Sequence, residues 1–128
     1  MTQWSDVQDF LRERYRLAED QPDMVSLVWS YDEGRSQKVI LRRFVANQAE
    51  ILEIKSAFAR RGDVEPEELL RVNARLPLAT TALSGDVYLV VYNVLCTTVT
   101  MESLDTLLGR VAAVADSLEE KYSPADRF

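Results

Sequence analysis

The chain carries one residue that often serves as a nucleophile or redox group, the single cysteine Cys96. Such chemistry needs a thiolate, which a neighbouring cation or a metal stabilises. No cationic residue adjoins Cys96 in the sequence, and a mostly apolar run, Val87–Leu95, precedes it. Free cysteines usually pack as small hydrophobic side chains. The sequence therefore predicts that Cys96 is buried and structural.

Two arginines, Arg60 and Arg61, stand directly before a predicted helix, where anion sites are common. Backbone N–H groups and the helix dipole attract phosphate and carboxylate groups at such a position. Four acidic residues already occupy the start of this helix, namely Asp63, Glu65, Glu67 and Glu68. Their charge suits the dipole without a ligand, so the pattern favours a charged helix start over an anion site.

Charged residues on the middle strands form a third candidate. Glu53 and Lys55 share one face of a predicted strand, and Arg42 on the preceding strand is expected opposite them. The set is typical of cross-strand charge pairs on a solvated sheet face. A polar binding groove is the alternative reading of the same residues.

The chain contains no histidine. This removes the commonest general base and the commonest neutral metal ligand. A zinc site would have to be built from Cys96 and carboxylates alone. The turn Ser84–Asp86 is typical of a hairpin and not of a nucleophile elbow. We therefore expect no enzyme, no catalytic residue, no metal and no cofactor, although carboxylate-only or lysine-based chemistry is not removed by the missing histidines.

The elements that would position these residues form a single predicted domain, 1–128, of the α+β class. Apolar residues at helical spacing predict helices at residues 3–18, 66–76 and 101–122. Alternating apolar residues between turn signals predict strands at residues 23–31, 37–46, 49–58, 78–83 and 87–96. Short turns between neighbouring strands indicate antiparallel pairing. The expected fold is an antiparallel five-stranded sheet with helices, in the order α-β-β-β-α-β-β-α.

The last predicted strand is apolar on both of its faces. One face carries Val87, Leu89 and Val91, and the other carries Tyr88 and Val90 among others. A small antiparallel sheet with one wet face alternates apolar and polar residues instead. The chain's own helices can cover one side, so a second subunit or partner is expected on the other. We predict a homodimer with Val87, Leu89 and Val91 in its interface.

Two further apolar residues, Ile40 and Phe44, alternate with Lys38 and Arg42 along the second predicted strand. This spacing places them on the sheet face away from the main core. Apolar residues on a mixed face are typical of a protein-binding surface. We predict that Ile40 and Phe44 contact a partner, with simple packing at the sheet edge as the alternative.

The composition limits the partners. The net charge is −6, which argues against nucleic acid and anionic membrane surfaces, since both attract basic patches. A single cysteine allows no intrachain disulfide and indicates a reducing compartment. The first residues show no signal peptide, and no apolar stretch reaches the ~20 residues of a membrane span. We expect a cytoplasmic protein.

The element order and length resemble the type III secretion chaperone-like fold, a group that includes the secretion chaperones and the YbjN-type bacterial proteins. The local likeness lies in the run Leu69–Leu78, the following turn Ser84–Asp86 with its apolar strand, and the amphipathic helix 101–122. The resemblance implies a homodimeric, acidic, cytoplasmic binding protein. It also implies that partners are extended, partly unfolded polypeptide segments laid along the dimer.

Three hypotheses for function follow. The first is a non-enzymatic, homodimeric protein that binds a protein client through apolar patches on the sheet and on helix 3–18. The second is a regulatory or scaffold subunit, in which the surplus apolar face serves only the homodimer or docks a larger partner. The third is a small-molecule-binding domain or enzyme with a pocket between sheet and helices, which the missing histidines and missing phosphate loops disfavour.

Overall fold

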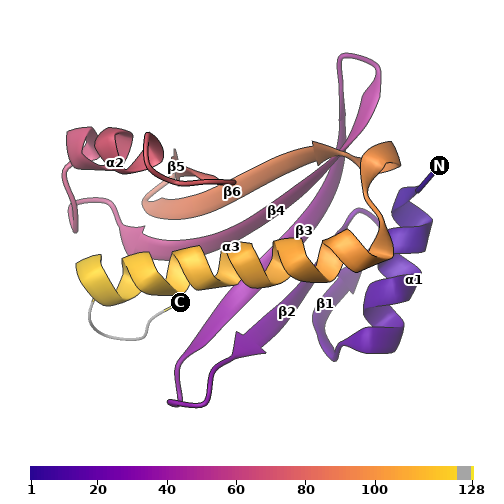
Figure 1. Ribbon diagram of the computed structural model, residues 1–128, viewed down its shortest axis with the longest axis horizontal. Helices are drawn as coiled ribbons and strands as arrows, with labels where there is room; N and C mark the ends of the chain where they lie inside the picture. Colours follow the sequence, from indigo (N-terminus) through magenta and orange to yellow (C-terminus); the bar gives the residue numbers. More distant parts are fainter. Residues whose placement is uncertain (124–127) are drawn as a thin grey trace.

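One antiparallel sheet of six strands organises the molecule (Figure 1). The computed structural model describes residues 1–123 and 128. The helical elements are α1 (Trp4–Arg14), α2 (Pro66–Asn73), the short 3-10 turn η1 (Cys96–Thr98) and α3 (Met101–Tyr122). The strands are β1 (Leu17–Gln21), β2 (Met24–Ser30), β3 (Ser36–Ala46), β4 (Ala49–Arg60), β5 (Thr80–Ser84) and β6 (Val87–Leu95). They lie in the order β1-β2-β3-β4-β6-β5.

The α+β class is confirmed. The expected number of five strands and the expected helix 3–18 are wrong, and both errors lie in the same segment. The helix ends at Arg14, and Leu17–Gln21 forms β1, which pairs with β2 through a two-residue turn. The described order is therefore α-β-β-β-β-α-β-β-α, with η1 before the last helix. The side-chain amide of Gln8 donates to the Gln21 carbonyl at 2.8 Å, so α1 holds the new edge strand by a tertiary contact.

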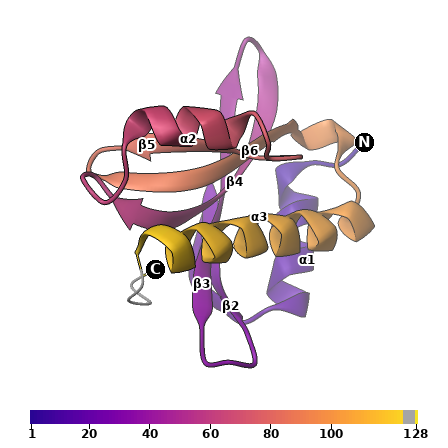
Figure 2. The ribbon, with the colours of Figure 1, turned by 60° about the vertical axis from the view of Figure 1, so that its left-hand side comes forward.

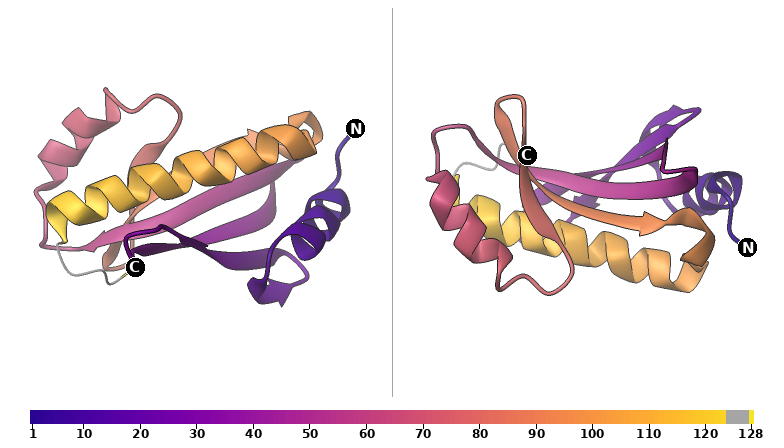
Figure 3. Two further views of the ribbon diagram at one scale, coloured as in Figure 1. Left: turned by 60° about the horizontal axis from the view of Figure 1, so that its bottom comes forward. Right: turned by 90° about the horizontal axis from the view of Figure 1, so that it is seen from above.

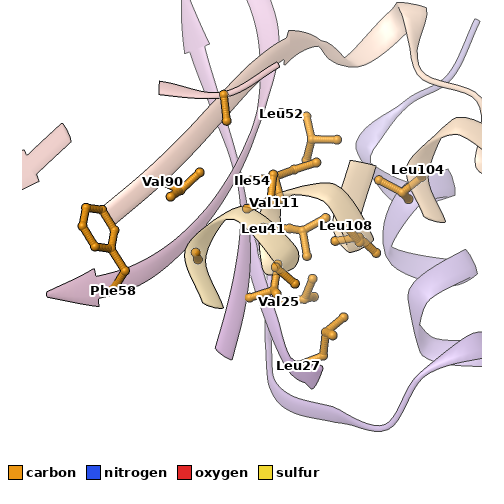
Figure 4. Close-up of a cluster of buried hydrophobic side chains, with 14 of the residues drawn as sticks. Val25, Leu27, Leu41, Leu52, Ile54, Phe58, Val90, Leu104, Leu108 and Val111 are labelled. Carbon is orange, nitrogen blue, oxygen red and sulfur yellow. The ribbon is translucent and has the colours of Figure 1, made fainter. Parts of the chain in front are cut away.

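Helix α3 packs across one side of the sheet, here called the helix face. Figure 4 shows Leu108 and Val111 of α3 close to Leu41 and Ile54 of the central strands. All four are buried, with relative exposures of 0–2%. The predicted stripe of α3 is thus the main core contact. Thr100 caps the start of this helix, since the Ser103 N–H donates to the Thr100 hydroxyl at 3.0 Å.

The other two helices lie at opposite ends of the sheet (Figure 2). Helix α1 buries Trp4, Val7 and Leu11 at the β1 end. Helix α2 begins at Pro66, as predicted, and lies beside β5. The carbonyl oxygen of the Asn73 side chain accepts from the Thr81 N–H at 2.7 Å, which occupies part of the exposed edge of β5.

Candidate protein-binding surface

The side of the sheet opposite α3, here called the open face, is the first candidate surface. Figure 3 shows α3 on one side of the sheet only. Strand β4 alternates between buried residues on the helix face, such as Leu52 and Ile54, and half-buried residues on the open face, such as Ile51 and Glu53. None of the helices within residues 1–123 covers this second set, so the apolar members of the open face meet solvent.

The structure brings the predicted contact residues Ile40 and Phe44 onto this open face. Strand register places Ile40 opposite Lys55, and Lys55 opposite Val91. Phe44 lies opposite Ile51 in the same way. Both residues are half-buried, so the prediction that they face away from the core is confirmed. Their contact with a partner stays a prediction.

A trio of charges interrupts the apolar rows at the centre of the open face. The Arg42 Nε lies 3.0 Å from the Glu53 carboxylate, and the Lys55 Nζ lies 3.1 Å from it. Burial by itself raises the pKa of Glu53, but the hydrogen bonds from Arg42 and Lys55 outweigh it and hold that pKa below its ordinary value. The predicted cross-strand charge pairs are present, and the Arg42 guanidinium also covers the Phe44 ring at 4.6 Å from its centroid.

Strand β6 is apolar on both faces, as predicted, and the chain covers only one of them well. Tyr88 and Val90 are buried on the helix face, whereas Val87, Leu89 and Val91 are half-buried on the open face. These three residues continue the apolar surface of Ile40 and Ile51 toward β5. Their place in a dimer interface stays a prediction.

A second surface was not foreseen from the sequence. An apolar groove with a volume of about 250 Å³ lies between α3 and the connection from α2 to β5. Its lining includes Leu76, Leu78, Tyr92, Leu107 and Val114. The leucines of the connection belong to the run that resembles the secretion chaperones, but nothing in their spacing shows that α3 stands opposite them.

One cation lies at this groove. Arg110 of α3 lines it and is exposed. Among residues 1–123 and 128 no carboxylate forms an ion pair with Arg110, whereas Arg12, Arg14, Arg35, Arg42, Arg43 and Arg71 are all paired. The groove therefore combines an apolar floor with one unneutralised positive charge.

Cys96 is fully buried, as predicted. Burial first, and then the nearby Glu50 carboxylate, raises the pKa of its thiol to about 11. Glu50 in turn accepts from Arg43 Nε at 2.6 Å and from the Trp4 N–H at 3.3 Å. The cluster joins β3, β4 and the start of α1, and it keeps the thiol protonated, so its arrangement is structural.

The loop before α2 contains a local hydrogen bond. The Asp63 carboxylate accepts from the Arg60 N–H at 2.8 Å. Residues 1–123 and 128 include no group of three or more cysteine and acidic side chains arranged to hold a metal ion. No helix among them is long and apolar enough to cross a membrane.

Comparisons with known proteins give a match in fold. No protein-family model and no curated protein sequence matches the chain. A chain of the ExsC–ExsE complex superimposes with a TM-score of 0.71 at 18% identity, over 98% of this chain and 99% of that chain. A chain of the HopA1–SchA chaperone–effector complex gives 0.64 at 15% identity, over 94% and 99%. A chain of the ExoU–SpcU heterodimer from the type III secretion system of Pseudomonas aeruginosa gives 0.63 at 14% identity, over 93% and 99%.

These likenesses extend over nearly the whole of both chains. They show that the protein has the type III secretion chaperone-like fold that the sequence resemblance implies.

Proposed function

We propose that this protein is a non-enzymatic binding protein that holds a segment of a protein client on the open face of its sheet, as a homodimer in the cytoplasm. The observation that carries the proposal is the open face itself, on which half-buried apolar residues lie in rows that no helix of residues 1–123 covers. Its structural neighbours are complexes of proteins with proteins, one of them a chaperone with its effector.

The composition of the open face suits a polypeptide. The apolar residues Ile40, Phe44 and Ile51 lie beside the charges of Arg42 and Glu53. Protein interfaces have this pattern, an apolar centre that supplies most of the energy and a polar rim that fixes orientation. Arg42 and Lys55 both already contact the Glu53 carboxylate, so an approaching apolar segment leaves neither the carboxylate nor either cation without a partner.

The proposed homodimer uses Val87, Leu89 and Val91 of β6. Covering these half-buried side chains with a second copy removes apolar surface from water, which contributes roughly 25 cal/mol per Å². The scaffold alternative differs in one respect, because there this surface serves the homodimer or one permanent partner and no client segment binds at Ile40 and Phe44.

The test is capture of client by variants of the open face. The protein is used to recover partners from the cells that produce it, and binding of a recovered partner is then measured by calorimetry. Ile40→Ser and Phe44→Ser should keep the wild-type circular dichroism spectrum and weaken binding by about tenfold or more, since a few apolar anchors dominate interfaces.

The matched control for this test is Val45→Ser. Val45 neighbours Phe44 on β3, is 59% exposed and points to the opposite side of the strand. It should bind like wild type. Normal binding by folded Ile40→Ser and Phe44→Ser would contradict the proposed client site and favour the scaffold alternative. Failure of these variants to fold would place the two residues in the core.

A further inference from the structure

The charged trio at the centre of the open face has an excess of positive charge. Arg42 and Lys55 share the single carboxylate of Glu53. The side chain of Glu53 is 13% exposed, whereas those of Arg42 and Lys55 are 44% and 24% exposed. The two cations are therefore more open to solvent than the carboxylate that they share. Although the whole chain has net charge −6, the trio carries one net positive charge.

Apolar residues lie on both sides of the trio at a regular spacing. On β3, Ile40, Arg42 and Phe44 follow one another at two-residue steps and point to the open face. Ile51 of β4 lies opposite Phe44 and widens the apolar position there. Along the strand direction the surface is thus apolar, then cationic, then apolar, over roughly 13 Å at about 3.3 Å per residue.

We propose that the client segment bound here is an extended strand that runs along β3 and β4 and carries an acidic residue between two apolar residues, each two positions away from it. The acidic side chain contacts the trio, and the apolar side chains contact Ile40 and Phe44. Strands of sheets packed face to face commonly run within about 30° of each other, and their alternate side chains share one spacing. The inference rests on the proposed client site and specifies the chemistry of the client.

An acidic side chain suits the trio better than a basic one. A carboxylate from the client gives Arg42 and Lys55 a second anion, so that two cations then face two carboxylates. Hydrogen bonds between such ionised groups are stronger than those between neutral groups. A lysine in the same place would instead put a third cation beside one carboxylate, and this repulsion lowers affinity.

A path across the strands would need no acidic residue. Phe44, Ile51 and Leu95 lie side by side on β3, β4 and β6, so a segment laid across them meets only apolar side chains. The path along the strands is favoured because it matches both the charge of the trio and the spacing of Ile40 and Phe44. The position of the acidic residue in the client separates the two paths, since a shift by one position turns its side chain to the opposite face.

Fluorescence anisotropy with short synthetic peptides tests the inference. The wild-type protein should bind a labelled peptide with the central motif Leu-Ser-Glu-Ser-Leu about tenfold more tightly than the same peptide with Leu-Ser-Lys-Ser-Leu. It should also bind it several-fold more tightly than the peptide with Leu-Glu-Ser-Ser-Leu, which has the same composition but turns its acidic side chain away from the trio. Added salt should reduce both preferences.

Variants of the trio should change this preference. Lys55→Glu reverses the net charge of the trio and should make the lysine peptide the tighter ligand, with circular dichroism as the check on folding. Lys55→Gln leaves the trio neutral and should reduce the preference to about twofold or less, so the test does not depend on the folding of Lys55→Glu. The matched control is Arg16→Glu, which makes the same change of total charge at an exposed position of the α1–β1 connection and should keep the wild-type preference.

The outcomes separate this inference from the proposed function. Equal affinity of the wild-type protein for the three peptides, or no measurable binding of any of them, would overturn the inference. A full preference retained by Lys55→Gln would overturn it as well, because the trio would then not be the cause. The client site itself is tested separately, by binding of the recovered partner to Ile40→Ser and Phe44→Ser.

Discussion

At the scale of single residues, the least expected feature is the cluster around Glu50. The Glu50 carboxylate accepts hydrogen bonds from the Arg43 guanidinium, from the Trp4 N–H at the start of α1 and from the Cys96 thiol. The hydrogen bond from Arg43 is the main cause that holds the pKa of Glu50 below its ordinary value, against a smaller opposing effect of burial. Because its pKa is lowered in the folded protein, Glu50 stabilises the fold when its carboxylate is ionised.

This cluster predicts a pH-dependent stability. Because the folded pKa of Glu50 is lowered, its contribution is present above the unfolded value of 4.5 and is lost as the pH falls through the folded pKa. Glu50→Gln should therefore melt at a lower temperature than wild type at pH 7, and the gap should narrow as the pH falls below 4.5. Thermal melts across this range decide the matter, with Glu33→Gln in the exposed β2–β3 turn as the control. A gap independent of pH would show that the charge of Glu50 is not what stabilises the cluster.

At the scale of elements, α3 packs on the central strands of the sheet, whereas α2 lies beside the edge strand β5. The apolar stripe of α3 is buried against the three strands β3, β4 and β6. Helix α2 instead packs through Leu69 and Val72, and its Asn73 side chain accepts a hydrogen bond from the Thr81 N–H of β5. The two helices should therefore differ in their sensitivity to substitution.

Leu108→Asp should unfold the protein or lower its free energy of unfolding by at least ~3 kcal/mol, because it places an unpaired charge at a fully buried position of α3. Glu67→Ala should change that free energy by only ~0.5 kcal/mol, since its ion pair with Arg71 is exposed. Thermal and urea melts of both variants provide the measurement. A Leu108→Asp melt equal to that of wild type would mean that α3 does not pack on the sheet through this face.

At the scale of the whole molecule, the sheet has one face covered by the chain itself and one face left open. The apolar residues of the open face run from Phe44 and Ile40 across β4 to Val91 and Leu89. The proposal divides this surface between a client segment and a second copy.

If a second copy covers the β6 part of the open face, substitutions there should lower the molecular mass of the particle in solution from dimer toward monomer. Wild-type protein at micromolar concentration should scatter light as a dimer, and Leu89→Ser combined with Val91→Ser should shift it toward monomer without loss of circular dichroism. The reason is that both side chains are half-buried in the single chain and their remaining apolar surface is covered only by association. A wild-type monomer at these concentrations, or a double variant that remains fully dimeric, would remove β6 from the interface.

Much of the fold follows from the sequence because its signals are local. The stripe of α3, its cap at Thr100, the turn at Asn47–Gln48 and the alternation of β3 each depend on residues within a few positions of one another. The facing of Ile40 and Phe44 follows for the same reason, since side chains alternate along a strand whatever its neighbours are.

Other features were decided by contacts between distant residues. β1 is short and polar, and its pairing with β2 and its contact with Gln8 hold it as a strand although Leu17 also fits the helical spacing. The groove exists only because the α2–β5 connection lies opposite Arg110 of α3. The sequence by itself determined the helices apart from the end of the first one, most strands and the two apolar faces of β6. The tertiary structure decided which of those faces α3 covers and which is left for a partner, because burial depends on what packs across the sheet and not on the order of residues along one strand.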